Sequence, residues 1–90
     1  MEIGNSMYLV TDHRAYTAAI LQACYSTWVR LDRQGRSPGT VREDDLVQEL
    51  VGAGLAENAA EICARLCWDV DWSAKNPLTA WLKAVRAFYL

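Results

Sequence analysis

Apolar residues recur at helical spacing in four segments of this 90-residue chain; glycine lies in the first two breaks between them, and Pro77 follows the third. Apolar side chains three or four residues apart lie on one face of a helix, whereas glycine and proline interrupt helices. The sequence therefore predicts an all-α fold, a compact bundle of about four helices. The predicted helices span approximately residues 12–34, 41–51, 55–70 and 77–90.

The first predicted helix is the longest, and Thr11 or Asp12 is the expected N-cap. Its apolar stripe consists of Ile20, Leu21, Cys24, Trp28 and Leu31. Residues 1–10 precede this helix, and we expect them to be extended or disordered. Ser6–Val10 has the composition of a short extended segment, but no second segment offers itself as a partner strand.

The later helices carry terminal signals. Thr40 and Glu43 have the T-x-x-E spacing of a capping box and predict the start of the second helix. Gly52-Ala53-Gly54 is expected to end it, with a glycine in the left-handed conformation. Asn76-Pro77 predicts the start of the last helix, because proline is tolerated at the first helical position.

Length and composition limit the class of protein. Residues 1–90 are expected to form a single helical domain, and a hydrophobic content of 52% argues against disorder. The formal net charge of −2 and a pI near 5.2 argue against a general nucleic-acid binder and against binding to anionic membranes. The N-terminus lacks a basic region followed by a long apolar stretch, so we expect a cytoplasmic protein with no membrane span.

No residue pattern in the chain indicates an active site, a metal or a cofactor. Cys63 and Cys67 lie one helical turn apart, but no cluster of cysteine and histidine completes a metal site. Together with Cys24 they are expected to be free thiols that pack as small apolar residues. No nucleophile turn accompanies them or His13, so we expect a protein that is not an enzyme.

The charges are segregated along the chain. Residues 43–71 hold eight acidic residues and one base, Arg65, whereas the segments on either side are net basic. The acidic residues are Glu43, Asp44, Asp45, Glu49, Glu57, Glu61, Asp69 and Asp71. Spread over neighbouring helices, they predict one electronegative surface that could steer a basic partner to the protein. Helix-start preference explains several of them individually.

Two tryptophans accompany this acidic stretch. The predicted helix over residues 55–70 has an apolar stripe that we expect to face inward: Leu55, Ala59, Ile62, Cys63, Leu66 and Val70. Trp68 lies off this stripe, and Trp72 lies near the expected end of the helix. Tryptophan is enriched among residues that dominate binding energy at protein interfaces. Trp68 and Trp72 are therefore candidate anchors, and core packing explains them equally well. Trp28 and Trp81 are expected to belong to the core.

These features favour a noncatalytic inhibitor or regulator whose acidic helical face, with Trp68 or Trp72, binds a larger protein with a basic surface. That partner could itself bind nucleic acid. In its small size and lack of motifs the chain resembles the stand-alone anti-defence proteins of phages and mobile elements, including anti-CRISPR proteins. One alternative is a DNA-binding regulator that resembles a helix-turn-helix protein and uses Arg30, Arg33, Arg36 and Arg42. The other is a self-associating bundle, for example a homodimer.

Overall fold

The computed structural model describes the backbone of residues 2–90 and the side chains of residues 13–90. Four α-helices and one short 3-10 helix, η1, follow one another along the chain, and residues 2–90 contain no strand. The elements are α1 (Glu2–Arg33), η1 (Pro38–Thr40), α2 (Glu43–Gly52), α3 (Glu57–Trp68) and α4 (Pro77–Tyr89). The predicted all-α bundle of about four helices is confirmed.

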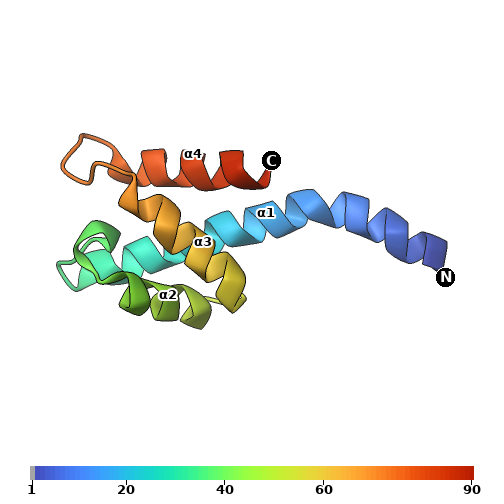
Figure 1. Ribbon diagram of the computed structural model, residues 1–90, viewed down its shortest axis with the longest axis horizontal. Helices are drawn as coiled ribbons and strands as arrows, with labels where there is room; N and C mark the ends of the chain where they lie inside the picture. Colours follow the sequence, from blue (N-terminus) through green and yellow to red (C-terminus); the bar gives the residue numbers. More distant parts are fainter. Residues whose placement is uncertain (1) are drawn as a thin grey trace.

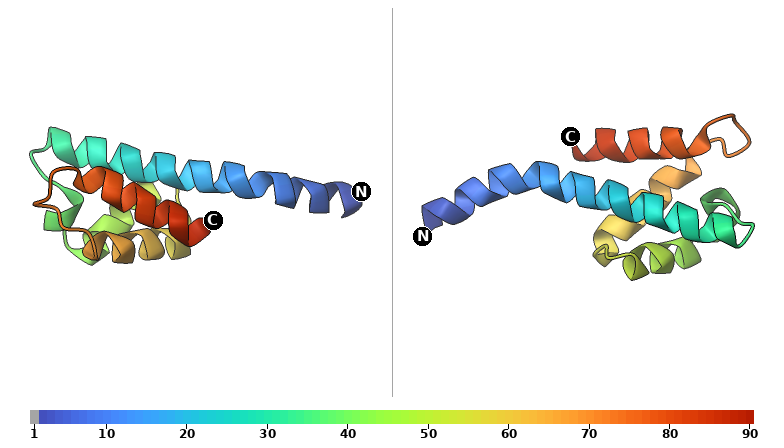
Figure 2. Two further views of the ribbon diagram at one scale, coloured as in Figure 1. Left: turned by 90° about the horizontal axis from the view of Figure 1, so that it is seen from above. Right: turned by 180° about the vertical axis from the view of Figure 1, so that it is seen from behind.

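α2, α3 and α4 lie on one side of the C-terminal part of α1 (Figures 1 and 2). α4 runs beside α1 in the opposite direction, and α2 also contacts α1. α3 contacts both α2 and α4. The N-terminal part of α1 extends beyond the other helices in all three views (Figures 1 and 2). No helix among the described residues combines the length and apolarity that a bilayer crossing requires.

The start of α1 differs from the prediction. The helix begins at Glu2, so the predicted N-cap at Thr11 or Asp12 is wrong, and the backbone of residues 2–10 is helical rather than extended. No proline lies between Met1 and Arg33, and a lone Gly4 costs only about 1 kcal/mol relative to alanine. No residue between Glu2 and Arg33 therefore prevents the helix from beginning at Glu2.

The boundaries of α2 and α4 follow from local contacts. Thr40 does not cap α2, because that helix begins at Glu43 with Arg42 as its N-cap. The Thr40 hydroxyl instead accepts from the Ser37 amide at 3.3 Å and donates to the Ser37 carbonyl at 2.9 Å, which closes η1. Gly54 has a φ of +113°, so the predicted glycine with positive φ at the end of α2 is confirmed. Pro77 stands at the start of α4 after the N-cap residue Asn76, as predicted.

The core joins large side chains from α1, α2 and α4. Its largest fully buried apolar members are Trp81, Ile20, Leu31, Leu46, Leu50 and Val85. The Trp81 indole Nε1 donates a hydrogen bond to the Cys63 carbonyl at 3.0 Å, which fixes α4 against α3. A buried indole requires such a partner, and the bond orients the ring. The predicted core role of Trp81 is confirmed.

The buried face of α3 consists of small residues: Ala59, Ala60, Cys63, Ala64 and Cys67. Small side chains allow neighbouring helices to approach closely. Ile62 and Leu66, which the sequence predicts to face inward, are only half buried. They lie at the edge of this face, because the alanines rather than the larger side chains occupy its centre.

The three cysteines are free and buried, as expected. Burial raises the pKa of the Cys67 thiol to about 12, so this thiol stays protonated at neutral pH. Because the reactive form of cysteine is the thiolate, Cys67 is chemically quiet in the folded protein. The cysteines therefore act as small apolar core residues.

Candidate functional site

A groove between α2 and α3 collects five of the eight acidic residues of segment 43–71. It has a volume of about 390 Å³. Its acidic lining residues are Glu43, Asp44, Asp45, Glu57 and Glu61, and Val47, Gln48 and Arg65 complete the wall. We call it the acidic groove. The predicted electronegative surface thus has a structural counterpart for these five residues.

The groove arises because α3 folds back along α2. The turn between the helices contains Gly54, and the first turn of α2 then lies beside the C-terminal half of α3, where Arg65 Nη2 is 3.8 Å from Glu43 Oε2. Glu43, Asp44 and Asp45 occupy the first turn of α2, where the helix dipole favours negative charge. The same preference explains Glu57 in the first turn of α3. Two separate acidic stretches consequently meet in space.

The acidic groove is strongly unbalanced in charge. Arg65 is its only basic lining residue, and the Arg65–Glu43 pair is weak because the Arg65 side chain is 79% exposed. The other four carboxylates form no ion pair with any residue among 13–90. These carboxylates are Asp44, Asp45, Glu57 and Glu61. Their charge is therefore available to a cation from outside the chain.

Trp68 lies beside the acidic groove. A second hollow of about 350 Å³ is lined by Glu43, Arg65, Trp68 and Asp69, so it shares two residues with the groove. The Trp68 side chain is the most exposed large apolar side chain among residues 13–90, at 71%. Nothing in the described fold covers it. Trp68 and Asp69 therefore lie next to the acidic groove, and the Trp68 side chain is exposed rather than packed in the core.

Trp72 has a different environment. Its indole Nε1 donates to the Cys67 carbonyl at 3.1 Å, and its ring lies edge-on to Trp81 with centroids 5.8 Å apart. The ring also covers Gly39 so closely that any side chain at that position would collide with it. The structure therefore separates the two tryptophans: Trp72 packs against the core, whereas Trp68 faces solvent.

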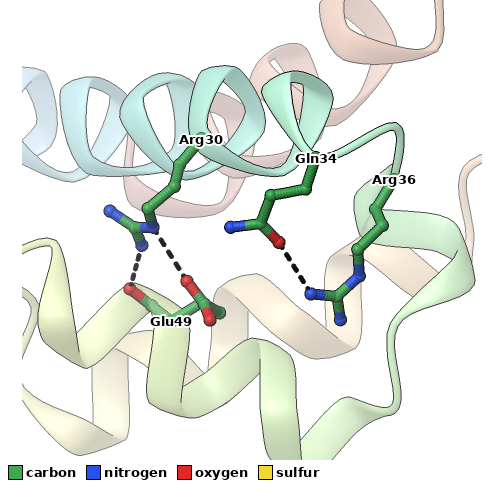
Figure 3. A network of polar contacts seen from close by, with 4 residues as sticks. All are labelled: Arg30, Gln34, Arg36 and Glu49. Carbon is green, nitrogen blue, oxygen red and sulfur yellow. Dashed lines mark hydrogen bonds and ion pairs between the residues drawn. The ribbon is translucent and has the colours of Figure 1, made fainter.

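Glu49 faces α1 rather than the groove. Its carboxylate Oε1 lies 2.9 Å from Arg30 Nε, and Arg30 Nη2 also donates to the Glu49 carbonyl at 2.9 Å (Figure 3). The pair joins α2 to α1. In the same region Arg36 Nη1 donates to Gln34 Oε1 at 2.8 Å. Two arginines that the DNA-binding alternative needs for phosphate contacts thus have partners within the chain.

Asp71 belongs to the loop between α3 and α4. It accepts hydrogen bonds from the Ser73 hydroxyl at 2.6 Å and from the Ser73 backbone amide at 3.0 Å. These bonds stabilise the carboxylate and lower the pKa of Asp71. Asp71 therefore has a local role in a turn and does not line the acidic groove.

An apolar cleft between α3 and α4 was missed at the level of sequence. It has a volume of about 450 Å³, and its lining residues are Asn58, Glu61, Ile62, Arg65, Leu66 and Phe88. Phe88 is 56% exposed. We call it the apolar cleft. The signal for it was the spacing of Ile62 and Leu66, which is helical but displaced by one position from the alanines and cysteines.

Residues 13–90 contain no group of three or more histidine, cysteine or acidic side chains arranged to hold a metal ion. The acidic groove lies beside an exposed indole and an apolar cleft. Comparisons with protein-family models, with curated proteins and with solved structures find no match to this chain.

Proposed function

We propose that this chain is a noncatalytic protein-binding module that binds a basic surface of a larger protein. The observation that carries the proposal is the acidic groove, in which five carboxylates from two helices face a single guanidinium. Four of these carboxylates have no ion-pair partner among residues 13–90. Like charges gathered in one groove repel one another, and a cationic partner offsets that repulsion.

Each part of the surface has a role in this proposal. The carboxylates steer a basic partner to the groove and fix its orientation. Trp68 and Asp69, at one end of the groove, contact the partner's surface. Desolvation of an exposed indole against a partner contributes more to affinity than most contacts at an interface do. The proposed partner-binding residues are Glu43, Asp44, Asp45, Glu57, Glu61, Trp68 and Asp69.

An inhibitor is the version of this function that we favour. An acidic protein that covers a nucleic-acid-binding surface blocks it, because the same basic side chains would otherwise contact phosphates. A cytoplasmic anti-defence protein of a phage or mobile element, such as an anti-CRISPR protein, is one form of this proposal. Its support is the acidic groove together with the small size of the chain.

The experiment is capture of partner proteins from a nuclease-treated lysate, followed by affinity measurement with the purified partner. Wild type is compared with Glu61→Lys and with the double variant Glu57→Lys/Glu61→Lys. We expect the partner to be retained by wild type, weakened at least tenfold by Glu61→Lys and lost with the double variant. Binding should also weaken as salt is raised, because exposed charges are screened.

Asp32→Lys provides the matched control. Asp32 is an exposed acid on α1 that lines none of the described hollows near α2 and α3, so its reversal changes net charge equally without altering the groove. Equal loss of binding by Asp32→Lys and Glu61→Lys would contradict the proposal. Retention of nucleic acid alone would favour the DNA-binding regulator, and a dimeric molar mass with no partner would favour the self-associating bundle.

A further inference from the structure

We infer that the apolar cleft receives the apolar face of a cationic amphipathic helix of the partner, whose basic side chains reach the neighbouring acidic groove. This inference rests on the proposed function and specifies the partner segment. It adds a second surface to the site, because the acidic groove alone would accept any basic surface.

The apolar cleft has the form of a helix-binding site. Asn58, Ile62 and Leu66 follow one another at four-residue intervals along one wall, so this wall extends for about 12 Å along α3. Phe88 of α4 forms the opposite wall. An apolar stripe on a helix, with side chains one turn apart, matches a wall built at the same interval. Ile62 and Leu66 are half buried, so their outer surfaces remain available for contact.

The cleft and the acidic groove are continuous. Glu61 and Arg65 line both, so these two residues form a ridge on α3 with apolar surface on one side and carboxylates on the other. Arg65 Nη2 lies 3.8 Å from Glu43 Oε2 of α2. A helix that places leucine or phenylalanine side chains in the cleft would carry its lysine or arginine side chains over the ridge toward Glu57 and Glu61.

Charge complementarity selects a cationic helix and fixes its orientation. The two charged residues of the cleft, Glu61 and Arg65, both stand on the α3 side and offset one another, and the other carboxylates of the acidic groove follow beyond them. On the α4 side, Arg86 lines a different hollow together with Arg14 of α1. The basic face of the bound helix must therefore point toward α2. An extended segment is a poorer occupant, because residues 2–90 offer no strand edge to which it could bond.

The test uses two synthetic helical peptides of equal length and equal lysine content, each labelled for fluorescence anisotropy. The amphipathic peptide has leucines along the face opposite its lysines, and the control peptide has alanine and glutamine there. We expect both peptides to bind wild type at low salt, and the amphipathic peptide to bind about tenfold more tightly, which corresponds to one well-buried anchor.

Variants of Phe88 locate this gain. Phe88→Ala should remove most of the tenfold difference, and Phe88→Lys should remove all of it, while the control peptide binds Phe88→Ala as it binds wild type. Phe88 is more than half exposed, so neither change should unfold the protein. Tyr25→Ala is the matched control: Tyr25 is an aromatic on α1 with 45% exposure that does not line the cleft.

The outcomes separate the two proposals. Equal affinity for the two peptides, or a gain that survives Phe88→Lys, would overturn the inference about the cleft and leave the acidic groove as the binding surface. Binding of neither peptide at low salt would contradict both proposals. Loss of the gain in Tyr25→Ala as well as in Phe88→Ala would also overturn the inference, because the effect would then not belong to the cleft.

Discussion

The two faces of α3 differ in burial and in the partners of their side chains. The inner face consists of alanine and cysteine, is fully buried and contacts the rest of the bundle, with the Cys63 carbonyl bonded to Trp81. The outer face carries Glu57, Glu61, Arg65 and Trp68, all exposed. Only Arg65 among these four forms an ion pair within residues 13–90, and that pair is long. Packing within the bundle explains the residues of the inner face, whereas it does not explain those of the outer face.

This difference separates stability from binding. A side chain whose partners lie within the chain should affect the free energy of unfolding when it is removed. A side chain without such partners should affect stability little, and any strong effect must appear in contact with another molecule.

Truncation of the buried tryptophan should have the largest effect. Trp81→Ala removes a fully buried indole and its hydrogen bond to Cys63, so the free energy of unfolding should fall by about 3–5 kcal/mol. Trp68→Ala, on the outer face, should change it by less than about 0.5 kcal/mol. Urea denaturation of both variants measures the contrast. Similar losses in the two variants would show that Trp68 is part of the core.

Alkaline pH should lower the free energy of unfolding through Cys67, on the buried face of α3. Burial raises the pKa of Cys67 from 9.0 to about 12 in the folded state. Between these values the unfolded state releases the thiol proton and the folded state keeps it. The stabilisation is therefore complete below pH 9 and is lost as the pH rises toward 12, by at most about 1.4 kcal/mol per pH unit.

The slope of stability against pH isolates this effect. Cys67→Ala should show a shallower decline than wild type between pH 9 and 11 in urea denaturation at a series of pH values. Some decline should remain, because burial also raises the pKa of Tyr89 to about 12, and the contact with Cys63 together with burial raises the pKa of Cys24. If the stability of Cys67→Ala fell as steeply with pH as that of wild type, the Cys67 thiol would ionise as readily in the folded protein as in the unfolded chain.

The Arg30–Glu49 pair should have an intermediate effect. Arg30→Ala removes two hydrogen bonds that join α1 to α2, and both side chains are partly exposed, so the cost should be about 1 kcal/mol. Arg33→Ala is the matched control, since the Arg33 side chain is exposed and forms no ion pair with residues 13–90. Thermal unfolding of both variants tests the contrast. An equal effect would mean that the Arg30–Glu49 pair does not stabilise the fold.

Arg65→Gln should have the smallest effect on stability, within about 0.5 kcal/mol, because the ion pair with Glu43 is long and exposed. Its effect on binding should be opposite in sign to that of Glu61→Lys. Removal of the only base from the acidic groove should tighten binding of a lysine-rich peptide two- to threefold. Weaker binding would mean that Arg65 itself contacts the ligand. Fluorescence anisotropy at fixed salt provides the measurement.

Helical periodicity and terminal signals predicted the fold class well. Gly54 and Asn76-Pro77 marked boundaries that depend on the local backbone alone. The start of α1 was wrong because a capping residue permits a helix to begin but does not require it. Thr40 was misassigned for a similar reason, since its hydroxyl oxygen accepts from the Ser37 amide and not from an amide of α2.

The candidate site could be predicted only in part. Acidic residues in two stretches indicated a charged surface, but their convergence required α3 to fold back on α2. Glu49 does not belong to that surface because it pairs with Arg30, which is nineteen residues away in sequence. Trp72 could not be distinguished from Trp68 because its hydrogen bond to Cys67 depends on the loop after α3. Ile62 and Leu66 were predicted to face inward because their side chains are large and apolar. In the structure alanines and cysteines form the buried face of α3 instead.

The most direct test is to map the binding surface by NMR chemical-shift changes of the labelled protein during titration with the lysine-rich amphipathic peptide. The account predicts shifts at the backbone amides of Glu43–Asp45, Glu57–Glu61, Arg65 and Trp68, with smaller shifts near Phe88. Amides of the buried face of α3 that are distant from the groove should change little. Shifts concentrated on α1 and around Arg14, or no shifts at low salt, would contradict the claim that the outer face of α3 binds a basic partner.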